Sequence, residues 1–105
     1  MNLDNLRIEI KRATQDGIKK TIGRYFECGK VDYCFIKDTK DGCFYIIHLD
    51  TGCSICKLAI NGTNENKAFE LLKQKVSEFD KTKLTKAVEK KREEMKSMGF
   101  AYPLN

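Results

Sequence analysis

Residues 31–60 have the sequence VDYCFIKDTKDGCFYIIHLDTGCSICKLAI, and this stretch decides the fold. Three short runs within it are rich in β-branched and aromatic residues, at 31–37, 43–49 and 53–60. Such runs are typical of β-strands. The connections between them end in glycine, at Gly42 and Gly52, as tight turns do. Because connections this short favour hairpins, the sequence predicts a three-stranded antiparallel meander.

On the N-terminal side, residues 3–27 are predicted to form one long helix. Apolar side chains recur there at spacings of three and four and give a helix one apolar face: Leu3, Leu6, Ile10, Ala13, Ile18, Ile22, Tyr25 and Phe26. Gly17 and Gly23 each weaken such a helix by roughly 1 kcal/mol relative to Ala, and we expect a bend near Gly17. Gly29 fits the residue that ends the helix.

On the C-terminal side, two more helices are predicted. The first runs from about Glu65 to Phe79 behind a cap at Thr63 or Asn64. The next is capped by Asp80 or Thr82 and ends at Gly99. Its apolar stripe is thin, with Leu84, Val88, Met95 and Met98.

The predicted order is therefore α-β-β-β-α-α, an α+β fold in which residues 1–105 form a single domain with a tail at 99–105. A three-stranded sheet needs a helix against at least one face to be stable. The first two helices are amphipathic enough to cover it, so we expect the third to lie at the edge or to protrude.

The expected strand register places Cys34, Ile46 and Cys56 in one row and Asp32, His48 and Ser54 in a neighbouring row. The second row has the composition of a nucleophilic triad, but the sequence has no nucleophile elbow and no glycine-rich loop beside it. His48 is the only histidine, which removes most acid–base schemes near neutral pH. We expect a protein that is not an enzyme.

Five cysteines are present, and no N-terminal apolar segment or long apolar span accompanies them. The sequence therefore predicts a cytoplasmic protein with reduced thiols. Cys53 and Cys56 form a CxxC pair that could serve zinc or redox chemistry. On a strand their sulfurs would point to opposite faces, so small buried hydrophobes are the favoured interpretation, with no metal and no cofactor.

Charge separates the ends of the chain from its middle. The net charge is +5 and the isoelectric point is near 9.0. Residues 1–30 carry seven basic and four acidic groups, residues 31–66 three and five, and residues 67–105 ten and six. Both predicted helical regions are therefore basic and the predicted sheet is mildly acidic, a balance compatible with phosphate binding.

Two classes of function follow from these features. The leading hypothesis is a binding module that acts by protein contact through the last helix and the tail, with Met95, Met98, Phe100 and Tyr102 in the contact surface. The alternative is a nucleic-acid-binding accessory protein that uses Lys86, Lys90, Lys91 and Arg92. A homodimer would be a third way to cover the exposed apolar groups, and the tail could instead complete the domain's own core.

The α-β-β-β-α-α order, led by a helix that begins Met1-Asn2, resembles that of small phage-encoded inhibitors of host nucleases, including some anti-CRISPR proteins. The resemblance lies in the order of elements and carries no site residues over to this chain. It implies an inhibitor or accessory factor from a phage or mobile element, with a protein partner.

Overall fold

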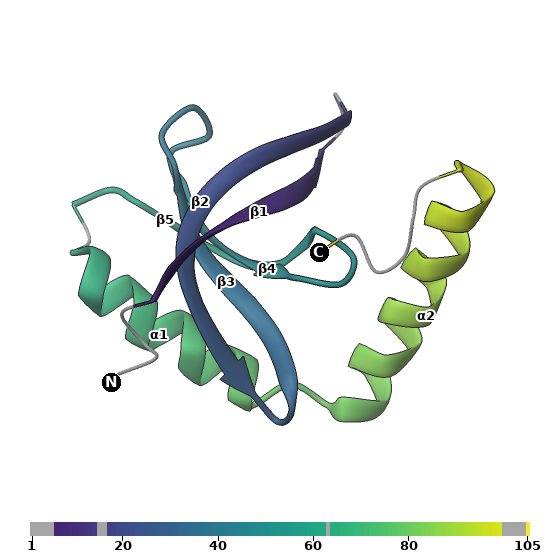
Figure 1. The fold of residues 1–105 in the computed structure, drawn as a ribbon. Helices are drawn as coiled ribbons and strands as arrows, with labels where there is room; N and C mark the ends of the chain where they lie inside the picture. The colour runs from purple at the N-terminus through teal and green to yellow at the C-terminus, as the bar shows by residue number, and fades with distance from the viewer. Residues whose placement is uncertain (1–5, 15–16, 63, 100–104) are drawn as a thin grey trace.

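The fold is a five-stranded antiparallel sheet followed by two helices, in a computed structural model that describes residues 6–14, 17–62, 64–99 and 105 (Figure 1). The elements are β1 (Arg7–Thr14), β2 (Gly17–Cys28), β3 (Val31–Asp38), β4 (Cys43–His48), β5 (Cys53–Ala59), α1 (Glu65–Ser77) and α2 (Lys81–Ser97). Neighbouring strands in the sheet are neighbours in sequence, so the sheet is a meander.

The predicted N-terminal helix over 3–27 is wrong. The described part of this segment forms the β1–β2 hairpin, in register from Arg7 opposite Arg24 to Thr14 opposite Gly17. Gly17 has a φ of 111°, which no right-handed helix contains. Several residues of the segment 3–27 are β-branched, which favours a strand. Ile8 and Ile10 also alternate with charged residues, which is the two-residue period of a strand.

The three strands predicted within residues 31–60 are confirmed as β3, β4 and β5. Ile46 faces Cys56 as expected, but Cys34 faces Ile47 and not Ile46. The cause is the β3–β4 loop, in which Gly42 donates its N–H to the Asp38 carbonyl at 3.0 Å. Asp38 pairs with Cys43, so this loop is one residue shorter than the predicted turn over 38–42, and a slip of one residue exchanges the two faces of a strand.

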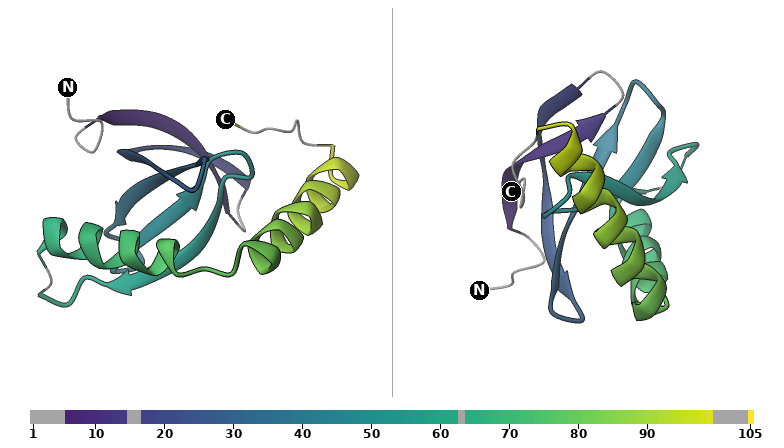
Figure 2. Two further views of the ribbon diagram at one scale, coloured as in Figure 1. Left: turned by 90° about the horizontal axis from the view of Figure 1, so that it is seen from below. Right: turned by 90° about the vertical axis from the view of Figure 1, so that its right-hand side faces the viewer.

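β2 is long and shared between two partners. Its first part pairs with β1, and its last part, from Arg24 onward, pairs with β3. At Gly23 an added Cβ would collide with the Phe35 carbonyl oxygen and the Cys34 sulfur. This close approach lets the β1–β2 hairpin curl over the rest of the sheet, as Figures 1 and 2 show.

The curl brings the two edges of the sheet together at one point. The N–H of Ala13 in β1 donates to the Gly52 carbonyl in the β4–β5 turn at 2.7 Å. The sheet therefore forms a partly closed barrel, with both faces buried over much of β3.

Each face of the sheet has its own hydrophobic core. On one face α1 packs Phe69 against Phe26 and Phe35, with ring centroids 5.6 and 5.1 Å apart. The opposite face, inside the curl, holds a second cluster made of Ile10, Cys34, Ile36, Ile47 and Leu49. Because alternate residues of a strand point to opposite faces, Phe35 belongs to the first core and Ile36 to the second.

Both helix caps fall among the predicted alternatives. The Asn64 side chain accepts from the N–H of Asn66 at 2.8 Å and begins α1. The Asp80 side chain accepts from the N–H of Thr82 at 2.8 Å and begins α2. α1 covers the sheet, whereas α2 lies beside the β4–β5 end of the sheet without extensive contact with it (Figure 2). No helix in the described ranges is long and apolar enough to cross a membrane.

Candidate functional site

An apolar groove lies between α2 and the start of β5. Its apolar lining is Cys53, Ile55, Phe79, Leu84, Ala87 and Val88, and its volume is about 450 Å³. Over the described residues, α2 makes no extensive contact with the sheet or with α1. The thin stripe of α2 therefore remains partly uncovered along this side. We call this feature the helix groove.

Charged residues surround the helix groove. Lys83, Lys90 and Lys91 line it together with Asp80 and Glu94. Lys91 forms an ion pair with Glu94 at 3.1 Å, and Asp80 is engaged as the cap of α2. The lining of the groove therefore has a small excess of positive charge, and α2 as a whole carries seven basic and three acidic side chains.

The residues predicted to form the contact surface separate in the structure. Lys90 and Lys91 line the helix groove, whereas Lys86 and Arg92 lie with Lys90 on a surface shared with Glu89 and Glu93. Met95 is buried, at 3% exposure, and Met98 is exposed, at 62%. Phe100 and Tyr102 lie outside the described residues.

His48 lines the helix groove and is 4% exposed. Its Nδ1 faces the Thr51 hydroxyl at 3.0 Å and the Thr51 N–H at 3.4 Å. Burial lowers the pKa of His48, against the opposing charges of Asp50 and Asp32. Its contacts with Thr51 close the β4–β5 turn, and its lowered pKa favours the neutral imidazole.

The predicted row of Asp32, His48 and Ser54 does not form. His48 lies opposite Tyr33 and Cys53, and Ser54 lies opposite Ile47 across a β-bulge. Asp32 instead accepts a hydrogen bond from the Tyr25 hydroxyl at 2.5 Å, which raises the pKa of Tyr25 to about 12. The one-residue shift of β3 against β4 separates Asp32 from His48, and the β-bulge between Ile46 and Ile47 separates Ser54 from His48.

All five cysteines are free thiols. Burial raises the pKa of Cys34 to about 12 and that of Cys56 to about 11, so neither is an activated thiolate. Within the described part of the chain, no group of three His, Cys, Asp or Glu side chains converges as metal ligands would.

A second hollow, of about 780 Å³, lies between the β1–β2 hairpin and the β3–β4 turn. Five cationic residues line it: Arg12, Lys19, Lys20, Lys37 and Lys40. Asp38 and Asp41 are the carboxylates in its lining. We call this feature the cationic basin. This basin was not predicted from the sequence, because its residues meet only when 7–28 form a hairpin.

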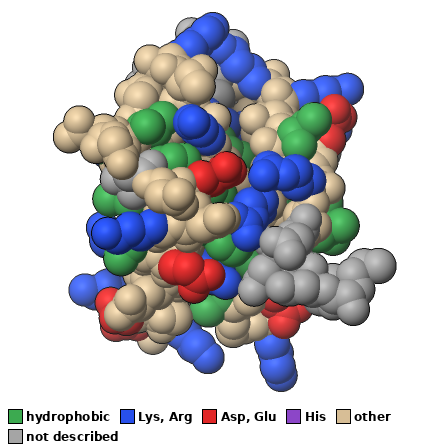
Figure 3. Space-filling view, turned by 90° about the vertical axis from the view of Figure 1, so that its left-hand side faces the viewer, with side chains coloured by type: hydrophobic (Ala, Val, Ile, Leu, Met, Phe, Trp, Pro, Cys, Tyr) green, Lys and Arg blue, Asp and Glu red, His purple; other side chains and the backbone are tan. Residues whose placement is uncertain are grey.

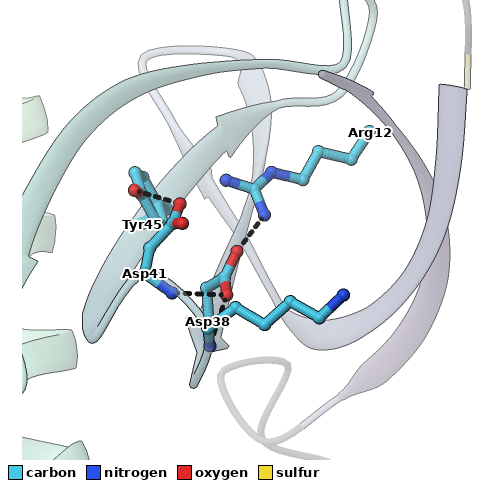
Figure 4. Close-up of polar contacts among 5 residues, drawn as sticks. Arg12, Asp38, Asp41 and Tyr45 are labelled. Carbon is cyan, nitrogen blue, oxygen red and sulfur yellow. Dashed lines mark hydrogen bonds and ion pairs between the residues drawn. The ribbon is translucent and has the colours of Figure 1, made fainter. Parts of the chain in front are cut away.

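A polar network forms one wall of the cationic basin (Figure 4). The Arg12 guanidinium donates to Asp38 at 2.7 Å and lies 4.6 Å from the centre of the Tyr45 ring. That hydrogen bond, with the N–H groups of Asp41 and Lys40, holds the pKa of Asp38 below its usual value. The Tyr45 hydroxyl donates to Asp41 at 2.8 Å, and this bond raises the pKa of Tyr45.

On the side of the molecule drawn in Figure 3, charge alone does not single out a surface. Figure 3 shows one side of the molecule, where Lys and Arg side chains are interleaved with acidic and apolar ones. The helix groove and the cationic basin are therefore distinguished by their shape together with their lining.

Comparisons with family models, curated proteins and solved structures gave no match for this chain.

Proposed function

We propose that this chain is a small binding module without catalytic activity of its own, which acts by protein contact through the helix groove. The observation that carries the proposal is the apolar lining of that groove, where α2 faces the sheet without packing closely on it. Apolar clefts of this kind between a helix and a sheet accept an apolar side-chain row from a partner segment.

The positive charge on α2 indicates that the partner segment carries acidic residues. Lys83 and Lys90 line the groove, and the helix as a whole has a net charge of +4. A partner segment with apolar residues on one face and acidic residues on the other would match both features. We therefore assign the groove to an amphipathic segment of an acidic protein.

The proposal sets the module in the cytoplasm, where five free thiols remain reduced. A module that works by contact alone either inhibits its partner or assists it. The resemblance to phage-encoded inhibitors depended on a leading helix, and β1 and β2 stand in its place. The proposal therefore depends on the groove and not on that resemblance.

The experiment is an affinity capture from lysate with the wild-type chain and two variants of α2. Ala87→Glu puts a charge into the groove, whereas Thr85→Glu puts the same charge on an exposed position outside its lining. We expect a protein that is captured by wild type and Thr85→Glu, is lost with Ala87→Glu, and withstands nuclease and added salt. A captured protein that Ala87→Glu retains would contradict the assignment of the groove.

Size-exclusion chromatography with light scattering tests the alternative that a second copy of the chain occupies the groove. Under the proposal the wild-type protein and Ala87→Glu elute with the mass of a monomer. A wild-type dimer that Ala87→Glu dissociates would assign the groove to self-association instead.

A further inference from the structure

The β1–β2 hairpin holds like charges directly opposite one another. Lys11 faces Lys20, and Arg12 faces Lys19 in the next pair of the ladder. Like charges at opposed positions destabilise an antiparallel pair. The two pairs lie on opposite faces of the hairpin and Asp38 already engages Arg12, so the chain offsets this repulsion only in part, and an anion would relieve the rest.

The alternation of β1 directs part of this charge into the cationic basin. Ile8 and Ile10 contribute to the cluster inside the curl of the sheet, and Arg12 is the next residue on the same face. Lys19, opposite Arg12, shares that face. On this face the apolar residues of the curl are thus followed by the cations Arg12 and Lys19.

The β3–β4 hairpin supplies the other wall of the basin. Lys37 and Lys40 are exposed there, as Lys20 is on β2. Against the five cations of the lining stand Asp38, which Arg12 engages, and Asp41, which Tyr45 engages. The described lining therefore has a net charge of +3.

Arg12 and the lysines have different roles in the cationic basin. The Arg12 side chain is 15% exposed and is fixed between Asp38 and the Tyr45 ring, so it sets the shape and potential of the wall. The exposed lysines are point charges on flexible stems, which suit contacts with phosphate oxygens but not the discrimination of bases. The Tyr45 ring is covered by Arg12 on one face and packs against the cluster inside the curl, so it is not a free stacking platform.

We propose that the cationic basin binds the phosphodiester backbone of a nucleic acid without reading its base sequence. The basin is wide and open and is lined from two separate hairpins, which fits a charged polymer better than a single small phosphate. This site is distinct from the helix groove and from the Lys86 surface of α2, where Glu89 and Glu93 dilute the positive charge.

The test is fluorescence anisotropy with a labelled mixed-sequence oligonucleotide of about 20 nucleotides, single-stranded or duplex, at low and at high salt. The basin variant combines Lys20→Gln, Lys37→Gln and Lys40→Gln. The matched control combines Lys86→Gln, Lys90→Gln and Lys96→Gln, which removes the same charge from α2. Circular dichroism establishes that both variants fold.

We expect the basin variant to weaken binding by about tenfold or more at low salt, and the control to change it by much less. The slope of log affinity against log salt should fall by about one for each basin lysine removed. Oligonucleotides of different sequence should bind equally.

Three results would overturn the proposal. The wild-type chain could fail to bind either oligonucleotide at low salt. The α2 control could lose as much binding as the basin variant, which would indicate diffuse charge and not a site. Pyrophosphate could compete with the oligonucleotide at an equal concentration of phosphate groups, which would assign the basin to a small phosphate compound.

Discussion

The side chain of Asn105 pairs with the backbone of Lys11 in both directions. Its Oδ1 accepts from the Lys11 N–H at 2.6 Å, and its Nδ2 donates to the Lys11 carbonyl at 2.9 Å. The same Nδ2 donates to the Leu49 carbonyl at 2.6 Å. Asn105 therefore fastens β1 to the end of β4, beside the place where Ala13 bonds to Gly52.

Replacing Asn105 should weaken this contact between β1 and the end of β4 and so lower the stability of the fold. Asn105→Ala removes three hydrogen bonds, of which the one to Leu49 is partly buried. We expect the free energy of unfolding, measured in urea, to fall by about 1 kcal/mol, since exposed hydrogen bonds contribute little. Asn61→Ala, at an exposed turn position, is the control and should leave it unchanged. Equal changes in the free energy of unfolding for the two substitutions would show that Asn105 does not stabilise the contact between β1 and the end of β4.

Gly23 should tolerate no side chain. In Gly23→Ala the new Cβ would overlap the Phe35 carbonyl oxygen and the Cys34 sulfur, and the backbone oxygen cannot move aside without breaking the sheet. We expect a loss of about 2–4 kcal/mol in the free energy of unfolding. Gly62→Ala meets open space and suffers only the strain of its φ of 79°, so it should lose about 1 kcal/mol. Similar losses at the two positions would contradict the close approach of β2 and β3.

His48 should make the fold sensitive to mild acid. Its pKa is lowered in the folded protein by burial, so the unfolded chain takes up a proton first as the pH falls through about 6.5. Stability from this group is complete above that pH. Below it the free energy of unfolding should decrease by up to about 1.4 kcal/mol per pH unit until the folded pKa is reached.

Urea unfolding between about pH 7.5 and 5.5 measures this decrease, above the range where carboxylates titrate. His48→Gln should remove most of the slope over the same range, whatever its effect on stability at neutral pH. A wild-type profile as flat as that of His48→Gln would show that His48 is not buried as a neutral group.

The parts of the fold that were predictable from sequence are those encoded by neighbouring residues. Gly42 and Gly52 mark the hairpins of β3, β4 and β5, and Asn64 and Asp80 mark the starts of the helices. These signals act within a few residues of where they occur, so no tertiary information is needed to interpret them.

The N-terminal third was not predicted because its apolar residues fit two periods. Ile10, Ala13 and Gly17 satisfy helical spacing, while Ile8 and Ile10 also alternate as in a strand. Packing of Ile10 against the inner face of the sheet decides between the two, and that contact is invisible in a local window. The cationic basin was missed for the same reason, since Arg12 and Lys37 meet only through the hairpin.

The sequence indicated the thin apolar stripe of α2 but not the helix groove. That stripe predicted a protruding helix, whereas Met95 of the stripe is buried. The opposite wall of the groove includes Ile55 of β5. A sheet wall of this kind depends on the direction in which α2 leaves α1, which the sequence of the linking residues does not specify.

Alkylation of Cys53 tests the docking of a partner in the helix groove most directly. Cys53 lines the groove, whereas Cys43 begins β4 outside the lining, and both are partly exposed. Mass spectrometry would compare the alkylation rates of the two thiols in the free protein and in the complex captured from lysate. Docking in the groove predicts that the complex protects Cys53 and leaves Cys43 reactive. A captured complex in which Cys53 reacts as fast as in the free protein would contradict it.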